Sequence, residues 1–290
     1  MKTAFVILHY QNDEVTRRCV RTLQELEGIE AQQIVIVDNA SPNGTGEKLR
    51  KQYEAYPNIH VLLTEENLGF ARGNNVGYLY AKQTLGAQQM VVMNSDVFIY
   101  DKAFLVHMEA AFAETGADIM GPEIYAPFHK LYQNPLAPAP MTPEETKALH
   151  AELKECLARV EMPVLGSCYV WYNHVMSKRK ARQQKQIPRR PQRQAGIVPH
   201  GSCVLYGQNW VQREDIAFVP NTFFYGEEHI LGYYAQQRGY SSCYVPELYV
   251  EHEAGATRNF AFGRETKKLR YFYKQQITAV EALLDMMDEK

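Results

Sequence analysis

The ten residues QIVIVDNASP, at positions 33–42, decide the fold of this chain. Four β-branched residues follow one another from Ile34 to Val37. This run predicts a strand buried on both faces, because a solvated face would place a polar residue at every second position. Asp38 and the four residues after it are typical of a turn. A buried strand that runs into a polar turn is the unit from which parallel sheets are built.

The same unit recurs along the first 121 residues. Short apolar runs predict strands, and the longer mixed segments between them predict helices. The strands are expected at Ala4–Leu8, Gln33–Val37, Ile59–Leu63, Met90–Met93 and Asp118–Met120, and the helices at Asp13–Leu26, Gly46–Tyr56, Arg72–Leu85 and Lys102–Thr115. This alternation predicts an α/β domain whose central sheet is mainly parallel, with helices on both faces.

The regular pattern breaks after residue 121. Prolines punctuate a loop, and Thr142 and Pro143 then predict the start of a helix that runs to about Val160. A basic stretch without acids follows at Lys178–Arg193. Further elements are expected as a strand at Gly201–Tyr206, a helix at Glu228–Gln237, a strand at Ser242–Val245 and a helix from Arg264 to about Met287. We therefore divide the chain into residues 1–121, a helical and basic insertion at 122–199, a second half at 200–262 and a C-terminal helix at 263–290.

The composition is that of an ordinary globular protein. Hydrophobic residues make up 46% and charged residues 22% of the chain, and the formal net charge is -2. No run approaches the ~20 apolar residues that a membrane-spanning helix needs. The 5 cysteines lack C-x-x-C spacing, which favours free thiols in a reducing compartment over a zinc site or a disulfide framework. These features predict a cytoplasmic protein, with peripheral contact at the inner face of a membrane left open.

Polar motifs follow two of the predicted strands. Asp38–Pro42 comes after the second strand, and Asn94-Ser95-Asp96 comes after the fourth. In open parallel sheets ligands bind beyond the carboxyl ends of the strands, so we expect the two motifs to share one site. The turn at His9–Asp13 contains no G-x-G-x-x-G, and the chain has no G-x-x-x-x-G-K-[ST]. A dinucleotide-binding domain and a P-loop are therefore excluded.

Five motifs, taken in order, resemble family 2 of the glycosyltransferases, and among them the rhamnosyltransferase-like branch. The motifs are Val37–Ser41, Glu66–Asn75, Asn94–Val97, Phe223–Glu228 and His252. The resemblance covers residues 3–121 and 200–273. It implies the Rossmann-like fold called GT-A, with a nucleotide-sugar-binding half at 1–121 and an acceptor and catalytic half at 200–262.

The resemblance implies that Asp38 recognises the base of the donor. A carboxylate at this strand end can accept the N3–H of uracil or thymine, so UDP or dTDP sugars are the expected donors. The alternative is a turn or cap for the next helix, and one side chain can serve both roles. Tyr10, after the first strand, is assigned to the same donor pocket.

The segment Asn67–Asn75 is implied to line the donor pocket as well. Asn67, Gly69 and Arg72 are its expected donor-binding residues, since glycine permits close backbone approach and the guanidinium suits phosphate. The alternative is an ordinary loop with a surface arginine.

Asn94-Ser95-Asp96 resembles the Asp-x-Asp motif of metal-dependent transferases, with Asn in first place. Mg²⁺ and Mn²⁺ prefer carboxylate oxygens together with water and phosphate. The resemblance makes Asp96 a direct ligand and His252 a second one, although a lone histidine is more often structural. Asn94 and Ser95 join the donor-binding set, with Asn94 near the ribose or a metal-bound water.

Glu227-Glu228 is the expected catalytic pair. In the family this pair is usually Glu-Asp and the second acid is the general base. Glu228 holds that position but is one methylene longer, so the choice between Glu227 and Glu228 stays open. Two acids that complement a helix dipole are the structural alternative. The implied reaction is a metal-assisted, inverting transfer of a sugar to a hydroxyl of a glycan or lipid-linked acceptor, in bacterial surface polysaccharide synthesis.

The basic stretch and the tail leave several interpretations open. Lys178–Arg193 has no aromatic residues, which argues against nucleic acid. It is either a solvated loop or a lid over an anionic acceptor or membrane surface. Lys267–Lys274 mixes cations with aromatics, and packing on the core, membrane contact and a homodimer interface are all compatible with it.

Two other functions fit the sequence less well than a transferase. A sugar-1-phosphate nucleotidyltransferase would need a glycine-rich loop with arginine directly after the first strand, and residues 9–16 have none. A non-catalytic polyanion-binding protein would leave Asp96, Glu228 and His252 without a role.

Overall fold

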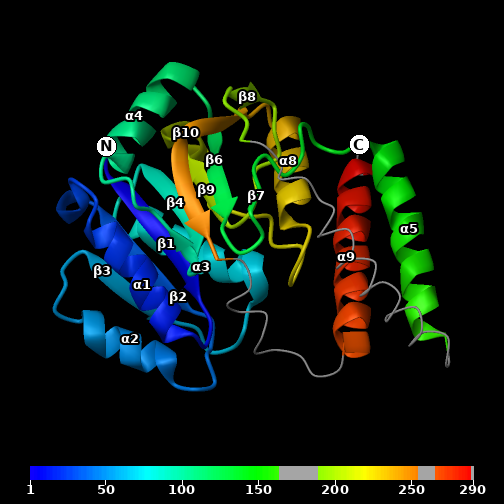
Figure 1. Cartoon of the computed structure of the whole chain (residues 1–290), viewed down its shortest axis with the longest axis horizontal. Coiled ribbons are helices and arrows are strands. Elements are labelled where there is room, and N and C mark those ends of the chain that lie inside the picture. The colour runs from blue at the N-terminus through cyan, green and yellow to red at the C-terminus, as the bar shows by residue number, and fades with distance from the viewer. Residues whose placement is uncertain (163–188, 254–264, 289–290) are drawn as a thin grey trace.

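A computed structural model describes residues 1–162, 189–253 and 265–288. A twisted central sheet carries helices on both faces, and two long helices stand side by side at one edge of the molecule (Figure 1). Among the described residues no helix combines the length and the apolar character that crossing a membrane requires.

The sheet is mainly parallel, as predicted. Its strands are β1 (Thr3–His9), β2 (Gln33–Asp38), β3 (Ile59–Leu63), β4 (Gln89–Asn94), β5 (Val97–Phe98), β6 (Ile119–Ala126), β7 (Leu131–Tyr132), β8 (Gln194–Ala195), β9 (Cys203–Tyr206) and β10 (Ser242–His252). Their order is β3-β2-β1-β4-β9-β6-β10-β5, with β7 on β6 and β8 on β10. The strands β3, β2, β1 and β4 are parallel to one another, as are β6 and β10, whereas β9 is antiparallel to both its neighbours.

Helices cover both faces because alternate residues of the strands belong to different cores. The helices are α1 (Asp13–Gln24), α2 (Thr45–Tyr53), α3 (Gly69–Gln83), α4 (Phe104–Thr115), α5 (Pro143–Glu161), α7 (Gln208–Arg213), α8 (Glu227–Gln237) and α9 (Glu265–Asp288), with a 3₁₀ turn at Ile29–Ala31. Phe5 and Ile7 pack with α1, α2 and α4, whereas Ala4 and Val6 pack with α3, α7 and α8. The unbroken apolar runs of the sequence reflect this burial on both sides.

Two strands run further than the sequence indicated. The strand predicted to end at Met120 continues to Ala126, and the one predicted to end at Val245 continues to His252. Proline is disfavoured inside central strands, and Pro122 and Pro246 stand just after the parts of β6 and β10 that were predicted. In the structure β6 and β10 lie side by side, and a break in register between Val245 and Tyr249 accommodates the irregular stretch. The predicted boundary after residue 121 therefore falls inside a strand.

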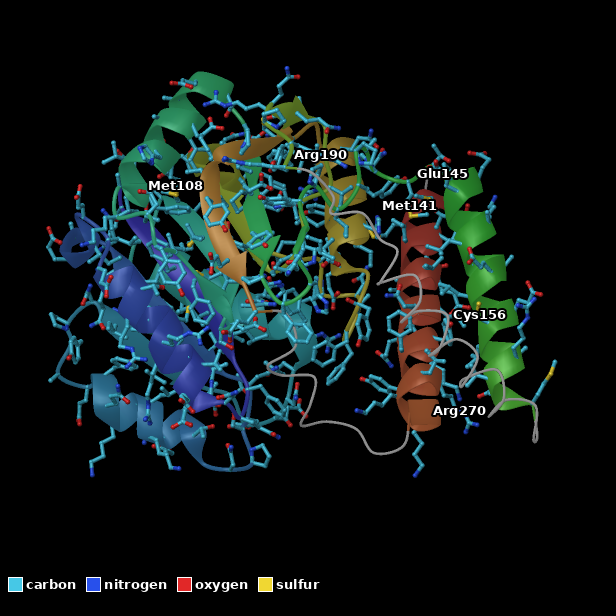
Figure 2. All side chains as sticks on the ribbon, in the orientation of Figure 1. Met108, Met141, Glu145, Cys156, Arg190 and Arg270 are labelled. Carbon is cyan, nitrogen blue, oxygen red and sulfur yellow. The ribbon has the colours of Figure 1, made fainter. Side chains whose placement is uncertain are left out.

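The α5/α9 pair is antiparallel, with Glu145 near the start of α5 and Arg270 near the start of α9 at opposite ends (Figure 2). The start of α5 is as predicted, since Thr142 and Glu145 form a capping box. Leu153 of α5 packs against Ile277 and Val280 of α9. The described part of the tail thus packs within the chain.

The end of the basic stretch is tied to the sheet by ion pairs. Arg189 donates from Nε to the buried Glu123 at 3.2 Å and from Nη2 to the carbonyl of Pro246 at 2.7 Å. Arg193 pairs with Glu114 and Glu247. The lysines and arginines at positions 178–185, which the lid hypothesis needs, lie outside the described residues.

Candidate active site

A cavity of about 500 Å³ opens at the carboxyl ends of β1 and β4. It is closed on the opposite side by the loop before α8 and by the end of β10. Eight of the predicted site residues line it: Tyr10, Asn67, Asn94, Ser95, Asp96, Glu227, Glu228 and His252. The structure thus brings the predicted donor, metal and catalytic residues into one space.

Asp96 and His252 meet because β5 pairs with the end of β10. The antiparallel register places His252 opposite Val97, so Asp96 just before β5 lies beside the imidazole. Its Oδ1 is 3.3 Å from Nε2 of His252, and both side chains are buried. The family resemblance named these two residues together, whereas no local pattern could, since they lie far apart along the chain.

The histidine is oriented by a residue that the sequence did not suggest. Nδ1 of His252 lies 2.7 Å from Oε1 of Gln133, so this nitrogen carries the proton and donates it. The lone pair of Nε2 then faces the Asp96 carboxylate, an arrangement that needs a proton or a cation between the two groups. Metal-ligating histidines are oriented in this way by a second hydrogen bond.

The pair fits a divalent cation. Two neighbouring ligands of an octahedral ion with bonds of about 2.1 Å lie about 3 Å apart, close to the Asp96–His252 separation. Within residues 1–162, 189–253 and 265–288 no group of three or more His, Cys, Asp or Glu side chains forms a metal cluster. A metal held here would therefore take its other ligands from phosphate and water.

His200 also lines the cavity, between the Asp96–His252 pair and the start of α8. Its ring lies 5.9 Å from that of His252, and its Nδ1 accepts a hydrogen bond from the backbone N–H of Ser202 at 3.2 Å. Burial lowers the pKa of His200 to about 4, so the ring is neutral at neutral pH. No motif in the sequence distinguishes this histidine.

The two catalytic candidates differ in environment. Oε1 of Glu228 accepts the backbone N–H of Gly201 at 3.2 Å. Glu227 is only 3% exposed, and its Oε1 has no hydrogen-bond partner. Burial, followed by the charge of Glu228, raises the pKa of Glu227 to about 8. Glu227 therefore holds a proton at neutral pH, which favours Glu228 as the base.

The chain enters α8 through a strained turn. Tyr225 has a φ of 72°, which is unusual for a bulky residue, and Gly226 follows with a φ of 80°. Strained backbone of this kind persists where surrounding structure enforces it, and it is concentrated at functional sites. The turn aims the first residues of α8 into the cavity.

The predicted donor loop is organised by Asn39. Its Nδ2 donates to Oδ1 of Asn67 and to the carbonyl of Gly69, both at 3.0 Å, and its Oδ1 accepts from the N–H of Leu68 at 2.9 Å. Asn67 thus contributes to the loop itself as well as to the cavity wall. Asn39 belongs to the Val37–Ser41 motif, but the sequence alone does not indicate that its side chain bridges Asn67, Leu68 and Gly69.

Gly69 joins this loop to the one before α8. Its φ is +77°, and a β-carbon at this position would lie 2.4 Å from the carbonyl oxygen of Phe223. The N–H of Phe70 donates to that same oxygen at 2.8 Å. Glycine is required at this position by both the backbone conformation and the contact.

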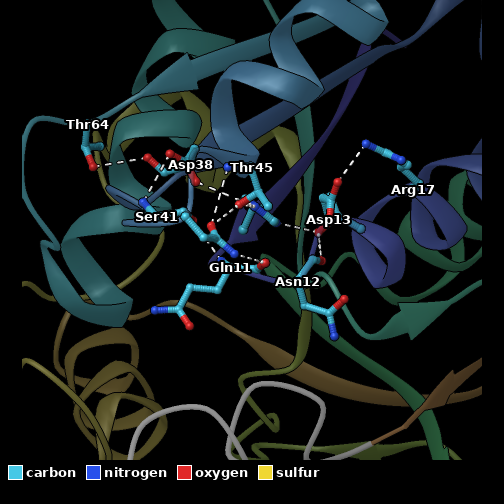
Figure 3. Close-up of polar contacts among 11 residues, drawn as sticks. Gln11, Asn12, Asp13, Arg17, Asp38, Ser41, Thr45 and Thr64 are labelled. Carbon is cyan, nitrogen blue, oxygen red and sulfur yellow. Dashed lines mark hydrogen bonds and ion pairs between the residues drawn. The ribbon is translucent and has the colours of Figure 1, made fainter.

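Three predicted donor residues, Gly69, Arg72 and Asp38, are not among the residues that line the cavity. Arg72 is exposed, and its Nε donates to the carbonyl of Pro220 at 3.3 Å. Asp38 is buried beside β1, and its Oδ2 accepts the N–H of Ser41 at 3.3 Å, as expected for the turn interpretation (Figure 3). Oδ1 of Asp38 has no hydrogen-bond partner. Nε2 of His9 lies 3.6 Å from it, and burial lowers the pKa of His9, which favours the neutral ring.

The sequence model described as Glycosyl transferase family 2 matches residues 4–217. The chain belongs to glycosyl transferase family 2. The prediction of a glycosyltransferase of this family is confirmed. The family 2 match includes Asn39, Asn67 and Asp96 and ends before the α8 acids, His252 and α9. No curated protein matches the chain.

Solved structures show the same fold. S. aureus TarS, residues 1–349, is 13% identical over 94% of this chain and 65% of that one, with a TM-score of 0.53. The mannosyltransferase PcManGT from Pyrobaculum calidifontis, in complex with GDP-Man and Mn²⁺, is 13% identical over 98% and 69%, with a TM-score of 0.53. In a TarS structure with UDP-GlcNAc the matched part spans 35% of that chain, at a TM-score of 0.38. The predicted GT-A fold of this family 2 member is confirmed.

Proposed function

We propose that the chain is an inverting, metal-dependent transferase that moves a sugar from a UDP or dTDP donor to a hydroxyl of a glycan or lipid-linked acceptor. One observation carries the proposal: the Asp96–His252 pair and Glu228 open into the same cavity. In such a transfer the leaving diphosphate must be stabilised while the attacking hydroxyl is deprotonated, one on either side of the sugar.

The metal side of the cavity is assigned to the leaving group. Asp96 and His252 would hold Mg²⁺ or Mn²⁺, which when bound neutralises the charge that builds on the diphosphate. PcManGT, whose complex contains GDP-Man and Mn²⁺, supports this assignment. Tyr10, Asn67, Asn94 and Ser95 line the same side and are proposed to contact the donor.

The side of the cavity that contains Glu228 is assigned to the acceptor. The acceptor oxygen forms a bond to the anomeric carbon, the bond from that carbon to the phosphate oxygen breaks with its electrons on the diphosphate, and the hydroxyl proton passes to Glu228. The N–H of Gly201 holds one oxygen of Glu228 and leaves the other for this proton. A single displacement inverts the configuration at the anomeric carbon.

Base recognition by Asp38 remains part of the proposal. Its unpaired Oδ1 can accept the N3–H of uracil or thymine, but the atom is buried. Base recognition therefore needs a rearrangement that opens this atom to the nucleotide. The proposed pathway, bacterial surface polysaccharide synthesis in the cytoplasm, rests on the resemblance of the motifs.

The two alternatives receive less support. Arg189 and Arg193 are paired with acids of the same chain, which lowers their availability to a polyanion. A nucleotidyltransferase gives no role to a base such as Glu228, because a phosphate oxygen needs no deprotonation to attack.

Thermal unfolding with nucleotides tests the function. We expect UDP or dTDP with Mn²⁺ to raise the Tm, GDP and CDP to have less effect, and Asp96→Asn to remove the Mn²⁺-dependent part. Asp215→Asn is the matched control, since Asp215 is a surface acid that pairs with Lys82. An equal response of the wild type and Asp96→Asn to Mn²⁺ would refute the metal site, and no response to any nucleoside diphosphate would refute the function.

A further inference from the structure

One face of α9 packs against α8 and against the loop before it, which contains Tyr225. Phe272 packs edge-on against Tyr225, with ring centres 5.0 Å apart. Further along, Leu283 and Met287 pack with Ile230 of α8. The residues of this stripe, at spacings of three and four, are Phe272, Gln276, Ala279, Leu283 and Met287.

Gln276 is the one polar residue in this apolar stripe. It lines the active-site cavity together with Tyr225, Glu227 and Glu228. Its amide makes no hydrogen bond to another residue within the described parts of the chain. The amide is not among the buried polar atoms that lack a partner, so it is accessible from the cavity, and its apolar neighbours in the stripe offer it no hydrogen bond. Packing therefore gives no reason for glutamine here.

The position of Gln276 relative to the base is fixed from two sides. A β-carbon at Gly226 would lie 2.6 Å from that of Ala279, so α9 is in close contact with the turn that precedes Glu227. On the other side Ile277 and Val280 pack on Leu153 of α5. An amide held on a rigid helix beside the base is well placed to orient a substrate.

We propose that Gln276 binds hydroxyl groups of the acceptor sugar next to the one that Glu228 deprotonates, and so helps to select the acceptor. The inference rests on the proposed function. A carboxamide accepts one hydrogen bond and donates two, which matches a pair of neighbouring hydroxyls. The family 2 match ends at residue 217 and does not include α9.

The test compares Gln276→Leu with Gln275→Leu, a change of the same residue type at the next position of α9, outside the cavity lining. Nucleoside diphosphate release is measured for UDP and dTDP sugars, with water alone and with a panel of methyl glycosides. We expect Gln276→Leu to keep the release in water and to raise the KM for the preferred glycoside about tenfold, with a smaller change in kcat. Gln275→Leu should leave both constants unchanged.

Thermal unfolding of Gln276→Leu distinguishes acceptor binding by Gln276 from a purely structural role. Gln276→Leu should leave the Tm unchanged, because the amide is accessible from the cavity and makes no hydrogen bond within the described residues that the change would remove. A lowered Tm, an unchanged KM, or release that no glycoside accelerates in the wild type would overturn the proposal. No release from any donor by the wild type would overturn the proposed function itself, so the two failures are distinguishable.

Discussion

The two loops that meet at Phe223 differ in how their polar groups are satisfied. In the donor loop, Asn39 and Asn67 accept or donate hydrogen bonds within the loop itself. In the first turn of α8, directly after the other loop, Oε1 of Glu227 and Nδ1 of His229 are buried without a hydrogen-bond partner. The amide cluster around Asn39 is satisfied without a ligand, although Oδ1 of Asp38 and Oδ1 of Asn74 nearby are buried without a partner. The first turn of α8 instead exposes to the cavity an acid whose buried oxygen lacks a partner, which costs stability until a substrate or a proton partner arrives. We infer that the Asn39 cluster is pre-formed, whereas the start of α8 is completed by its substrate.

The largest effect is expected from the base. Glu228→Gln should lower kcat by about a thousandfold, because the acceptor hydroxyl loses the group that takes its proton. Binding of the donor nucleotide, followed by thermal shift, should not change. Glu227→Gln is the matched control and should retain most of the activity. Equal losses in the two variants would contradict the assignment of the base.

The junction of the two loops is the next most sensitive point. Gly69→Ala should destabilise the protein by about 3 kcal/mol, since it adds a clash with the Phe223 carbonyl to the strain of a positive φ. Gly86→Ala shares the positive φ of +66° without any atom within 4 Å, and so measures the strain alone. The free energy of unfolding of each variant is measured by denaturant titration, and the difference between the two losses gives the contribution of the contact. Similar losses in both would mean that the contact between the loops contributes nothing.

The hydrogen bonds within the donor loop are tested by changing Asn39. Asn39→Ala removes three hydrogen bonds around Asn67, Leu68 and Gly69 and should cost about 2 kcal/mol. It should also weaken donor binding, because the loop loses its fixed shape. Asn58→Ala, which removes one hydrogen bond to Ile29, should cost less and leave binding intact. Unaltered donor affinity in Asn39→Ala would show that the loop does not need to be pre-formed.

The smallest effect on activity, and a distinct effect on stability, is expected from Glu227. Its pKa is about 8 in the folded protein, against a usual value of 4.5. Between these two values the folded state binds more protons than the unfolded state, so stability falls as the pH rises through this window. Glu227→Gln removes that dependence, and unfolding at pH 5 and pH 8 should show a flatter profile than in the wild type. An identical slope would mean that the carboxyl is not held protonated.

Much of the donor half could be predicted from the sequence, and the acceptor half only in outline. The strands at Ala4–Leu8 and Gln33–Val37 and the cap at Thr142 were identified because they depend on neighbouring residues alone. Arg72 was expected at the donor, but the structure turns it to the carbonyl of Pro220. The placement of Glu228 and His252 came from family resemblance. The residues that the sequence could not supply, Gln133, His200 and Gln276, reach the cavity from three separate segments.

The sequence by itself determined the elements of this protein, because hydrophobic periodicity and capping act over a few residues. Tertiary structure alone decided which of them meet. The reversed β9, the extension of β10 past Pro246, and the approach of Gln133 to His252 all depend on the order of strands in one sheet. Local propensity carries no information on that order. The sheet therefore decides which polar groups face the cavity, and with it where a metal, a base and an acceptor could meet.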